Sequence, residues 1–566
     1  MLKRLALVVL LAALAGAWYL ALPPRALSLP PLPPGLEEPL RGAIHVHSRR
    51  SDGTGEVGEI AAAAARAGLD FVVFTDHGDA TREPDPPQYR EGVLCIDAVE
   101  ISTSNGHVLA LGLPPAPYPL AGEARDVIED IARLGGFAIA AHPGSNRPEL
   151  RWSDWDVPLA GLEWLNADSE WRDESGWSLA RALFTYPIRT TETIVSLLDR
   201  PTGTLRQWDE LTKRRRVVAI AGTDAHARIG VRSLGEPYVN GSSIHVPSYE
   251  RMFRAFSNAL PGVTFSGDAA ADAQAVLAAI RAGHVYATID GLGGPAVLSF
   301  TATSGTATAA AGDVLPLGGP VTLRIAMQAP ERARMEIVKD GGVLETRTGA
   351  AVEHVVEAAP ASYRVEILLP AAPGEPPVPW MVSNPIYVGR DATDAVPSDT
   401  RPRPSRFAVQ YRDGPVTGWT VETSPASLGA LDVVKKVSGT QLSLRYGLGG
   451  AASSSPFAAF VMPAGSELSG YDRLMFTARA NRPMRVSVEL REPGGAAGER
   501  WHRSVYLDPT EHEITVYFDD MTPRGVTSRP QPTLANVQSI LFVVDTVNTP
   551  LGGNGTVWID DVRYAR

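Results

Sequence analysis

The chain has 566 residues, with 52 lysines and arginines, 63 aspartates and glutamates and a net charge of −11. This length exceeds that of one hydrophobic core and predicts roughly three or four domains, and the acidic balance argues against nucleic-acid binding, which needs a basic face. The single cysteine, Cys95, excludes an intramolecular disulfide and a cysteine-rich zinc site. Cys95 stands in an apolar run, so we expect it in the core, and His, Asp and Glu must hold any metal.

Residues 1–24 are predicted to be a signal anchor or a cleaved signal peptide. Lys3 and Arg4 precede an uncharged, mostly apolar run over 5–22, which is just long enough to span a bilayer core. Basic residues before the run predict an N-terminus inside the cell. Both alternatives place the body of the protein outside the cytoplasmic membrane. A Pro-rich linker is expected over 25–40.

Residues 41–290 alternate between short apolar runs and helical segments. The expected strands are GAIHVH, LDFVVFTDH, LCIDAVEI, HVLALGL, GGFAIAAHP, LAGLEWLN and RVVAIAGTDAH. The expected helices are VGEIAAAAARAG, EARDVIEDIARLG, WDELTKRRR and DAQAVLAAIRAG. Repeated strand–helix units of this kind predict an α/β domain built on a largely parallel sheet or barrel.

The character of the chain changes after this α/β segment. Residues 295–388 show two-residue alternation of polar and apolar side chains, which predicts an Ig-like β-sandwich. The polar, Pro-rich stretch 389–406 is expected to be a linker. Residues 407–566 carry further alternating runs and predict a second all-β sandwich. Its terminal strand WIDDVRY resembles the closing strand of carbohydrate-binding jelly rolls, which implies a sandwich of that type.

Side chains that ligate metals stand at or beside the ends of nearly all strands in 41–290. They are His45, His47, Asp76, His77, Glu100, His107, His142, Glu163, Asp224 and His226. Catalytic groups of a parallel α/β barrel gather at one end of its strands, and imidazoles at i and i+2 of a strand point the same way. Any one of these histidines alone would be an ordinary polar residue on an edge strand, but the whole set predicts a metal cluster.

The chain resembles the PHP superfamily of polymerase and histidinol phosphatase-type metallohydrolases. The matching motifs are HVHSRRSDG, FTDH, AVEIS, GHVLALG, AHPG and GTDAH, spread over residues 41–230. The helix and strand DAQAVLAAIRAGHVYAT, followed by a β-sandwich ending in SNPIYV, resemble the CehA/McbA-like branch, whose members carry an appended β-domain. The resemblance implies a distorted (β/α)7 barrel that holds two or three divalent metal ions, with Zn, Mn and Fe as candidates.

The resemblance also implies a set of ligands for each metal. The first metal would take His45, His47, Glu100 and Asp224; the second Glu100, His107 and His142; the third Asp52, His77 and His226. Of these, Glu100, Asp224 and His226 are the expected catalytic residues. Asp52 fills a position that is histidine in some relatives, a harder ligand that favours Mn or Fe over Zn.

Five further residues are expected to orient the ligands or to meet the substrate. Asp76 would orient His77 or a ligand across the pocket. Glu163 and Asn166 match a recurring motif and are interpreted as pocket residues, with a salt bridge to an arginine as the alternative for Glu163. Arg49 and Arg228, like Arg50, are either phosphate-binding or simply solvated.

Two groups of tryptophans leave alternatives open. Trp152, Trp155, Trp164, Trp171 and Trp177 are expected to form a lid or substrate wall, or else a local core. In the C-terminal sandwich, Trp419, Trp501 and Trp558 would stack on sugars if this domain binds a glycan, and otherwise pack within it.

The ligand set predicts a metal-dependent hydrolase. Bridged divalent metals lower the pKa of a shared water, so that hydroxide exists near neutral pH without a protein nucleophile. A small-molecule phosphoester is the first expected substrate, and a carbamate, ester or amide is the alternative that the family branch implies. A hypothesis of another class is an envelope protein whose metal barrel is structural and whose C-terminal sandwich binds glycan. Membrane contact is expected through the N-terminal helix alone.

Overall fold

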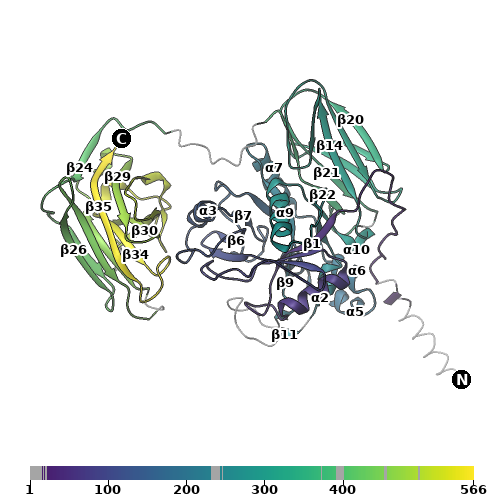
Figure 1. The fold of residues 1–566 in the computed structure, drawn as a ribbon, viewed down its shortest axis with the longest axis horizontal. Helices are drawn as coiled ribbons and strands as arrows, with labels where there is room; N and C mark the ends of the chain where they lie inside the picture. Colours follow the sequence, from purple (N-terminus) through teal and green to yellow (C-terminus); the bar gives the residue numbers. More distant parts are fainter. Residues whose placement is uncertain are drawn as a thin grey trace. The chain divides into compact units, whose positions relative to one another are not determined.

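The computed structural model describes residues 16, 18–19, 22–230, 243–244, 246–370, 372–390, 401–451, 455–494 and 498–566. It contains 38% strand and 17% helix. The chain forms two compact units (Figure 1). The first unit comprises residues 1–114 and 123–396, and the second comprises 115–122 and 397–566. The mixed α/β class with sandwich-like sheets is thereby confirmed, and the two regions predicted as barrel and first sandwich share one compact unit.

The predicted anchor over 1–24 lies largely outside the described residues. Among the residues that are described, we find no helix with both the length and the apolar character needed to cross a membrane. The Pro-rich segment that follows is attached to the first unit. The Leu27 amide donates to the Leu292 carbonyl at 2.8 Å, and the Gln328 side-chain amide donates to the Pro30 carbonyl at 2.8 Å.

The first unit is organised around a sheet that closes on itself. Its strands are β1 (Leu40–Val46), β2 (Phe71–Phe74), β3 (Gln88–Arg90), β4 (Val93–Asp97), β5 (Val99–Thr103), β6 (Gly106–Leu111), β7 (Phe137–Ala140), β8 (Gly161–Asn166) and β9 (Val218–Ala225). Parallel pairs join β4, β2, β1, β9, β8 and β7, and a parallel bridge between His77 and Glu100 brings β5 beside the end of β2. β6 alone is antiparallel to both of its neighbours, β5 and β7. β6 therefore begins at the rim of the sheet where β5 and β7 end.

The helices that the structure describes in the first unit are α2 (Val57–Ala67), α3 (Ala124–Arg133), α4 (Ala167–Arg172), α5 (Gly176–Thr185), α6 (Thr190–Val195), α7 (Thr202–Thr212), α8 (Tyr249–Phe253), α9 (Ala269–Ala282) and α10 (Asp290–Gly293). The predicted helices are confirmed at α2, α3 and α9, while α7 begins and ends earlier than predicted and α4, α5, α6, α8 and α10 were not predicted. Apolar side chains of the strands, such as Ile44, Val73 and Ile220, pack with Val276 and Ile280 of α9 in one buried cluster. Cys95 is buried in β4, as predicted.

The first β-sandwich shares a sheet with the α/β part. Its strands are β14 (Leu298–Ser304), β15 (Ala307–Ala310), β16 (Val314–Leu315), β17 (Val321–Met327), β18 (Arg334–Lys339), β19 (Gly342–Thr348), β20 (Ala351–Val356), β21 (Ala361–Leu368), β22 (Met381–Ser383) and β23 (Ile386–Val388). The short strands β12 (Ser257–Leu260) and β13 (Tyr286–Thr288) connect β1 to β22 by antiparallel pairing. Continuous hydrogen bonding through these strands explains why the two regions form one unit. The remaining short strands are β10 (Ile229–Gly230) and β11 (Ser243–Ile244).

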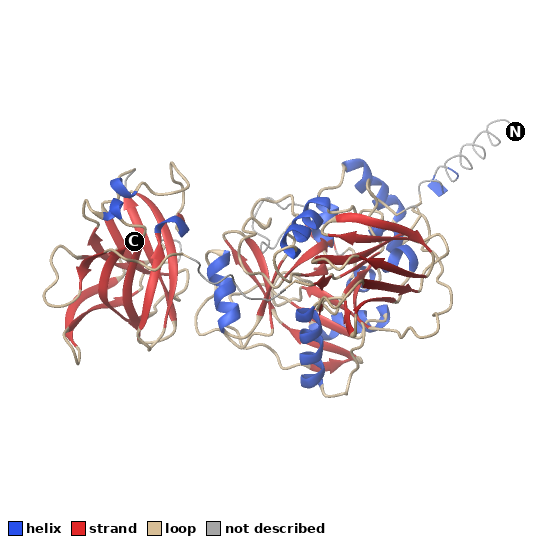
Figure 2. Ribbon diagram, turned by 90° about the horizontal axis from the view of Figure 1, so that it is seen from above, coloured by secondary structure: helices blue, strands red, loops and turns tan. Residues whose placement is uncertain are grey.

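The second unit is a β-sandwich of two sheets, seen as stacked strands in Figure 2. One sheet contains β24 (Phe407–Tyr411), β26 (Leu428–Lys435), β27 (Thr440–Gly447), β29 (Arg473–Ala480), β32 (His512–Tyr517) and β35 (Asn554–Ala565). The other contains β25 (Thr420–Thr423), β28 (Phe457–Pro463), β30 (Met484–Glu492), β31 (Glu499–Leu507), β33 (Thr522–Pro523) and β34 (Ser539–Asp545). Among its described residues are also the short 3₁₀ turns η2 (Leu468–Gly470), η3 (Phe518–Asp520) and η4 (Leu534–Asn536).

The tryptophans of the second unit are largely occupied by packing. Trp501 is fully buried in the core between the sheets, so its predicted role as a sugar platform is wrong. Trp419 packs against the same core and stacks on Phe542 with 6.0 Å between ring centroids. Trp558 carries the Arg479 guanidinium 3.7 Å above its ring. Apolar burial explains why these aromatic side chains are present without requiring a ligand.

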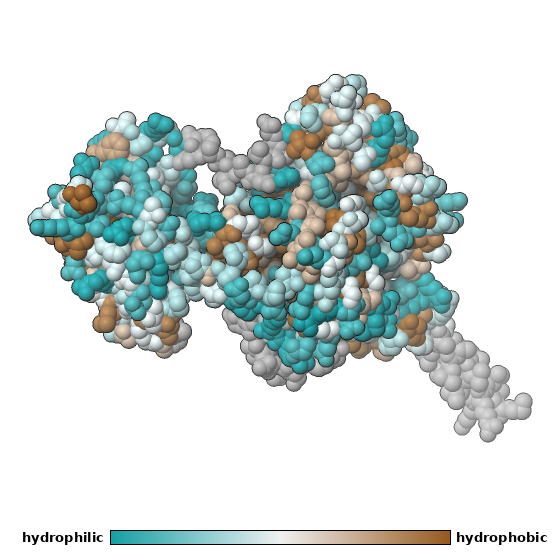
Figure 3. All heavy atoms as spheres, in the orientation of Figure 1, coloured by the Kyte–Doolittle hydropathy of each residue, from teal (hydrophilic) through white to brown (hydrophobic). Residues whose placement is uncertain are grey.

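The surface in view in Figure 3 intersperses hydrophobic residues (brown) with hydrophilic ones (teal). Scattered apolar side chains are normal on folded proteins, since polar surface is insufficient to cover a globule. The informative features of this chain are therefore its buried polar groups, and one cluster of them lies at a rim of the closed sheet.

Candidate metal centre

The backbone leaves regular geometry at three of the predicted ligands. His45, His142 and Asp224 have positive φ values of 69°, 32° and 44°. Such values are uncommon for residues with a side chain and store local strain, which is typical of functional sites. Both parallel pairings of β1, with β2 and β9, shift register at His45. His45 and His47 therefore converge through a break in the strand, and the simple alternation that we predicted is wrong in detail.

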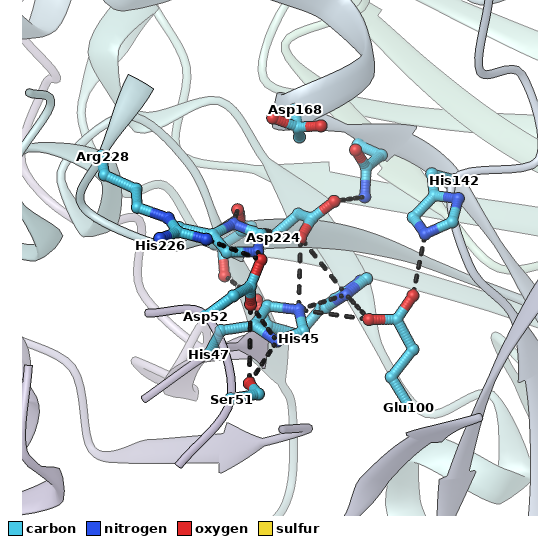
Figure 4. Close-up of polar contacts among 12 residues, drawn as sticks. His45, His47, Ser51, Asp52, Glu100, His142, Asp168, Asp224, His226 and Arg228 are labelled. Carbon is cyan, nitrogen blue, oxygen red and sulfur yellow. Dashed lines mark hydrogen bonds and ion pairs between the residues drawn. The ribbon is translucent and has the colours of Figure 1, made fainter. Parts of the chain in front are cut away.

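Four side chains converge on one point to form the first cluster (Figure 4). The Nε2 atoms of His45 and His47 lie 3.1 Å apart, and each lies 3.2 Å from Glu100 Oε2. Each also lies 3.4 Å from Asp224 Oδ1. Ligands 2.0–2.1 Å from a tetrahedral ion are separated by about 3.3–3.5 Å. The donor spacing of His45, His47 and Asp224 thus suits a shared divalent metal.

A second cluster uses the other oxygen of the same carboxylate. Glu100 Oε1 lies 2.8 Å from His107 Nδ1 and 2.8 Å from His142 Nε2. His142 Nδ1 lies 3.1 Å from the Leu150 carbonyl, an acceptor that keeps the proton on Nδ1 and leaves Nε2 free to ligate. Glu100 is therefore positioned to bridge two ions.

A third cluster surrounds Asp52. Its Oδ2 lies 3.1 Å from His226 Nε2, and its Oδ1 lies 3.4 Å from His47 Nδ1 and 3.9 Å from His77 Nε2. His226 Nδ1 donates to the Asp224 carbonyl at 2.8 Å, so the ring turns its other nitrogen toward Asp52. The described residues thus bring all nine predicted ligands into four overlapping groups, with the donor atoms of each group within 4.8 Å of one another. These groups could hold metal ions.

The electrostatics of the nine side chains follow from their burial. Burial opposes the charged form of His47, but hydrogen bonds to Asp224 and Glu100 outweigh it and raise its pKa to about 10. Burial likewise opposes ionisation of Glu100, yet His77, His45 and His107 hold its pKa well below the usual range. Burial lowers the pKa of His77 to about 4. The carboxylates are therefore charged and require compensating cations.

Glu163 and Asn166 hold the ligands in place. Glu163 Oε1 lies 2.6 Å from His45 Nδ1, and its Oε2 accepts from the His142 amide at 2.7 Å and from Asn166 Nδ2 at 2.8 Å. Asn166 Nδ2 also donates to Asp224 Oδ2 at 3.3 Å. Among the described residues, the ion-pair partner of Glu163 is thus His45 rather than an arginine. Carboxylates that accept from a ligating imidazole fix its tautomer and raise its basicity.

Gly222 makes room for Glu163, and this permits a first prediction. A Cβ atom at residue 222 would overlap the Glu163 carboxylate, so Gly222→Ala should displace the group that orients His45. We expect metal affinity to fall about 10- to 100-fold, measured by equilibrium dialysis with metal analysis. Gly203→Ala is the matched control, because nothing lies within 4 Å of its added Cβ. Equal affinities of the two variants would contradict this role of Glu163.

Asp76 organises the loop after β1. Its carboxylate accepts from the Ser48 amide at 2.8 Å, from Ser48 Oγ at 2.6 Å and from Ser51 Oγ at 2.7 Å. Ser48 and Ser51 stand beside His47 and Asp52, so of the two predicted roles these bonds fit the orientation of ligands across the pocket.

The three arginines near the motifs lie in different places. Arg49 is 61% exposed, and its guanidinium donates to Glu56 at 3.2 Å and to the Thr54 carbonyl, so of its two predicted alternatives the solvated one fits. Arg50 pairs with the carboxylates of Asp85 and Asp97 outside the centre. Arg228 alone reaches a ligand, with Nη2 3.3 Å from Asp52 Oδ2.

Sequence reasoning missed Tyr249, at the start of α8. Its hydroxyl donates to the His47 carbonyl at 2.8 Å and accepts from the amides of Thr54 at 3.0 Å and Gly55 at 3.2 Å. These bonds fasten the loop that carries His47 and Asp52. Tyr249 belongs to no recognised motif of the sequence, so nothing marked it in advance.

A cavity of about 340 Å³ adjoins the third cluster. Its polar end is formed by Asp224, His226 and Arg228, together with Asp168 and Glu170. The rest of its lining comes mainly from apolar residues of α5, α6 and the segments that flank them, among them Leu179, Ala182, Leu183, Ile194, Leu197, Leu198 and Met252. The tryptophans that were predicted to form either a lid or a local core lie in different environments. Trp171 lines this cavity, Trp152 and Trp164 are buried, and Trp177 is exposed.

Comparisons with known proteins identify no family for the chain. No protein-family model and no curated protein matches the sequence. Solved structures that match include the family 11 carbohydrate-binding module from Clostridium thermocellum in complex with a mixed-linked tetrasaccharide, at 15% identity and a TM-score of 0.24, covering 28% of this chain and 94% of that one. A family 30 carbohydrate-binding module of a cellulosomal cellulase of Clostridium thermocellum matches at 12% identity and a TM-score of 0.22, covering 28% of this chain and 96% of that one.

Proposed function

We propose that this chain is a metal-dependent hydrolase of the PHP type that acts on a phosphoester and uses two or three divalent ions. The observation that carries the proposal is the geometry of Glu100, whose two oxygens lie 3.2 Å from His45 and His47 and 2.8 Å from His107 and His142. A carboxylate shared between two groups of imidazoles is the arrangement that a bridged pair of divalent ions requires.

The nine ligands form three proposed metal sites. His45, His47, Asp224 and Glu100 would hold one ion, Glu100 with His107 and His142 a second, and Asp52 with His77 and His226 a third. Bound divalent ions would lower the pKa of a coordinated water and neutralise charge that develops on a phosphoryl oxygen. Zn, Mn and Fe all suit imidazole and carboxylate ligands.

Side chains around the ligands support the same reaction. Glu163 keeps His45 oriented, and Arg228 brings a fixed positive charge to the edge of the centre beside Asp52. A guanidinium at this position is suited to a phosphoryl oxygen of the substrate. The nearest hydroxyls, those of Ser48 and Ser51, donate to Asp76 and serve the loop rather than attack.

The direct test is turnover of 4-nitrophenyl phosphate and bis(4-nitrophenyl) phosphate by purified protein loaded with Mn, Zn or Fe. We expect metal-dependent turnover that is lost in His47→Ala and Asp224→Ala. Metal-loaded protein that leaves both phosphoesters intact but cleaves aryl esters or carbamates would replace the phosphoester by the alternative substrate. Glycan binding by the chain with no turnover of either class would contradict the enzyme proposal.

The proposal includes an extracytoplasmic location. Its support is the sequence alone: a basic start, the apolar run over 5–22 and a Pro-rich segment before the first unit. A fusion of residues 1–40 to a periplasmic reporter tests this, with cytoplasmic activity as the contradicting result. Glycan binding by the second unit stays a separate proposal, with Trp558 as the remaining aromatic candidate.

Metal binding should release protons, which gives a second prediction. The pKa of His47 is raised to about 10, so the metal-free protein carries this proton at pH 7. The bonds of protonated His47 to Asp224 and Glu100 stabilise the metal-free fold fully below pH 6.5, and that stabilisation is lost as pH rises through 10. A metal needs the imidazole deprotonated, so affinity should rise with pH. Calorimetry in two buffers of different ionisation enthalpy measures the protons released, and His47→Ala should release fewer.

A further inference from the structure

The cavity beside the third cluster has two chemically different ends. Asp224 and His226 contribute to the cavity wall and to the ligand groups, so the polar end of the cavity is continuous with the centre. Beyond them the wall consists largely of aliphatic side chains from α5 and α6 and the loop before α7, such as Leu179, Leu183 and Ile194. A single ligand that fills the cavity must therefore carry a polar group at one end and an apolar group at the other.

The apolar end lies open on the outer side of α5. Leu183 lines the cavity and is 75% exposed, and Leu179 lines it at 37% exposed. Trp177 and Phe184 on the same helix are also exposed, at 80% and 69%. Exposed aliphatic and aromatic side chains at the mouth of an apolar pocket mark a place where an apolar group enters.

The Glu170 carboxyl of the cavity lining does not oppose this use. Glu170 is buried, and its Oε2 accepts from the Asp199 amide at 2.7 Å. Burial raises the pKa of Glu170 to about 8. The group is therefore mostly uncharged at pH 7, and the lining between Trp171 and Leu198 carries little charge there.

We infer that the substrate is an amphiphile: its scissile phosphoryl or acyl group binds at the metal centre, and an alkyl or aryl tail occupies the cavity between α5 and α6. The inference rests on the proposed function and adds the class of substrate. A tail in this cavity leaves water in exchange for aliphatic contacts, so each methylene strengthens binding until the cavity is filled.

The experiment measures binding of n-alkylphosphonates from methyl to octyl to the metal-loaded full chain by calorimetry. These compounds are not hydrolysed, so binding is read without turnover. We expect affinity to rise by about fourfold per methylene over the first part of the series. An affinity that is independent of chain length would overturn the inference.

Two alanines on α5 provide matched variants. Ala182 lines the cavity and Ala180 does not. Ala182→Phe should fill the space, lowering octylphosphonate affinity toward that of methylphosphonate while leaving methylphosphonate binding unchanged. Ala180→Phe should retain the full chain-length effect. The same loss in both variants would contradict a tail in this cavity, because a general disturbance of α5 would then suffice.

A failure of the phosphoester proposal can be distinguished from a failure of the proposal that a tail binds in the cavity. If methylphosphonate does not bind although metals do, the series is repeated with n-alkylhydroxamates, which bind divalent ions through another head group. A retained chain-length effect that Ala182→Phe removes would then support the cavity and contradict only the phosphoester head. An alkylhydroxamate affinity that does not depend on chain length would contradict both the phosphoester head group and the tail in the cavity.

The tail could belong to a dissolved amphiphile or to a lipid. Trp18, within the apolar run over 5–22, donates its indole N–H to the Phe184 carbonyl at 3.3 Å, so this run reaches the first unit at α5. Phosphate release from phosphatidic acid in phosphatidylcholine vesicles separates the sources. Release that Ala182→Phe abolishes supports a lipid tail in the cavity; release equal in both alanine variants contradicts it.

Discussion

Glu100→Gln is expected to lower phosphoester turnover at least about 1,000-fold, or about 4 kcal/mol in activation free energy. Both oxygens of Glu100 face imidazoles, at 3.2 Å for His45 and His47 and at 2.8 Å for His107 and His142. An amide retains the size of the side chain but loses the charge that two neighbouring ions share. We therefore expect the variant to lose more than one metal equivalent, which elemental analysis of purified protein measures.

Glu489→Gln is the matched control for this result. Glu489 is a fully buried carboxylate of the second unit that pairs with Arg500 and Arg524. Its replacement removes a buried charge without touching the metal centre, so metal content and turnover should stay at the level of the unmodified protein. Glu100→Gln protein that keeps its full metal content would contradict the bridging role of Glu100.

Removing the metals should lower the thermal stability of the first unit by about 10 °C and leave the second unit unchanged. Each ion stabilises the folded state by about 4 kcal/mol when present at 1,000 times its Kd, and 1 kcal/mol corresponds to about 2–4 °C for a unit of 150–250 residues, and to less for a larger one. All nine ligands belong to the first unit. Scanning calorimetry of the full chain with and without a chelator should therefore show one transition that moves and one that does not.

A ligand-deficient variant controls the chelator experiment. His45→Ala with His47→Ala removes donors from the first and third clusters, and its first transition should respond less to the chelator. A transition that shifts equally in the variant and the unmodified protein would show that the chelator acts elsewhere. Two transitions that both move would contradict the assignment of the ions to the first unit.

The direction of one strand illustrates what the sequence pattern left undecided. His107 stands at the beginning of its strand, whereas His45 and Asp224 stand near the ends of theirs. β6 runs antiparallel to β5 and β7, so its first residues reach the same rim as the ends of the others. Apolar alternation is the same for either direction of a strand, which is why the pattern alone could not assign it.

Residues that hold loops or ligands in place, rather than bind a metal themselves, were the least predictable from the sequence. Asp76 was expected to orient His77 or a ligand across the pocket, and only the structure shows that it binds Ser48 and Ser51; Tyr249 carried no signal although it fastens the His47 loop. Arg49 stands between ligand motifs yet points to Glu56. Neighbours in sequence do not share a direction in a loop, because each residue has its own backbone dihedrals.

The sequence by itself determined the strand–helix order of the first unit, the all-β character of the rest and the types of metal ligand, because periodicity and residue chemistry are local properties. The tertiary structure alone decided how those ligands group. Glu100 faces two sets of imidazoles only because the sheet closes, and His45 joins His47 only because the backbone breaks at positive φ. The cavity beside α5 likewise exists only where separate helices meet. Contacts between distant segments depend on closure and packing, which no local pattern encodes.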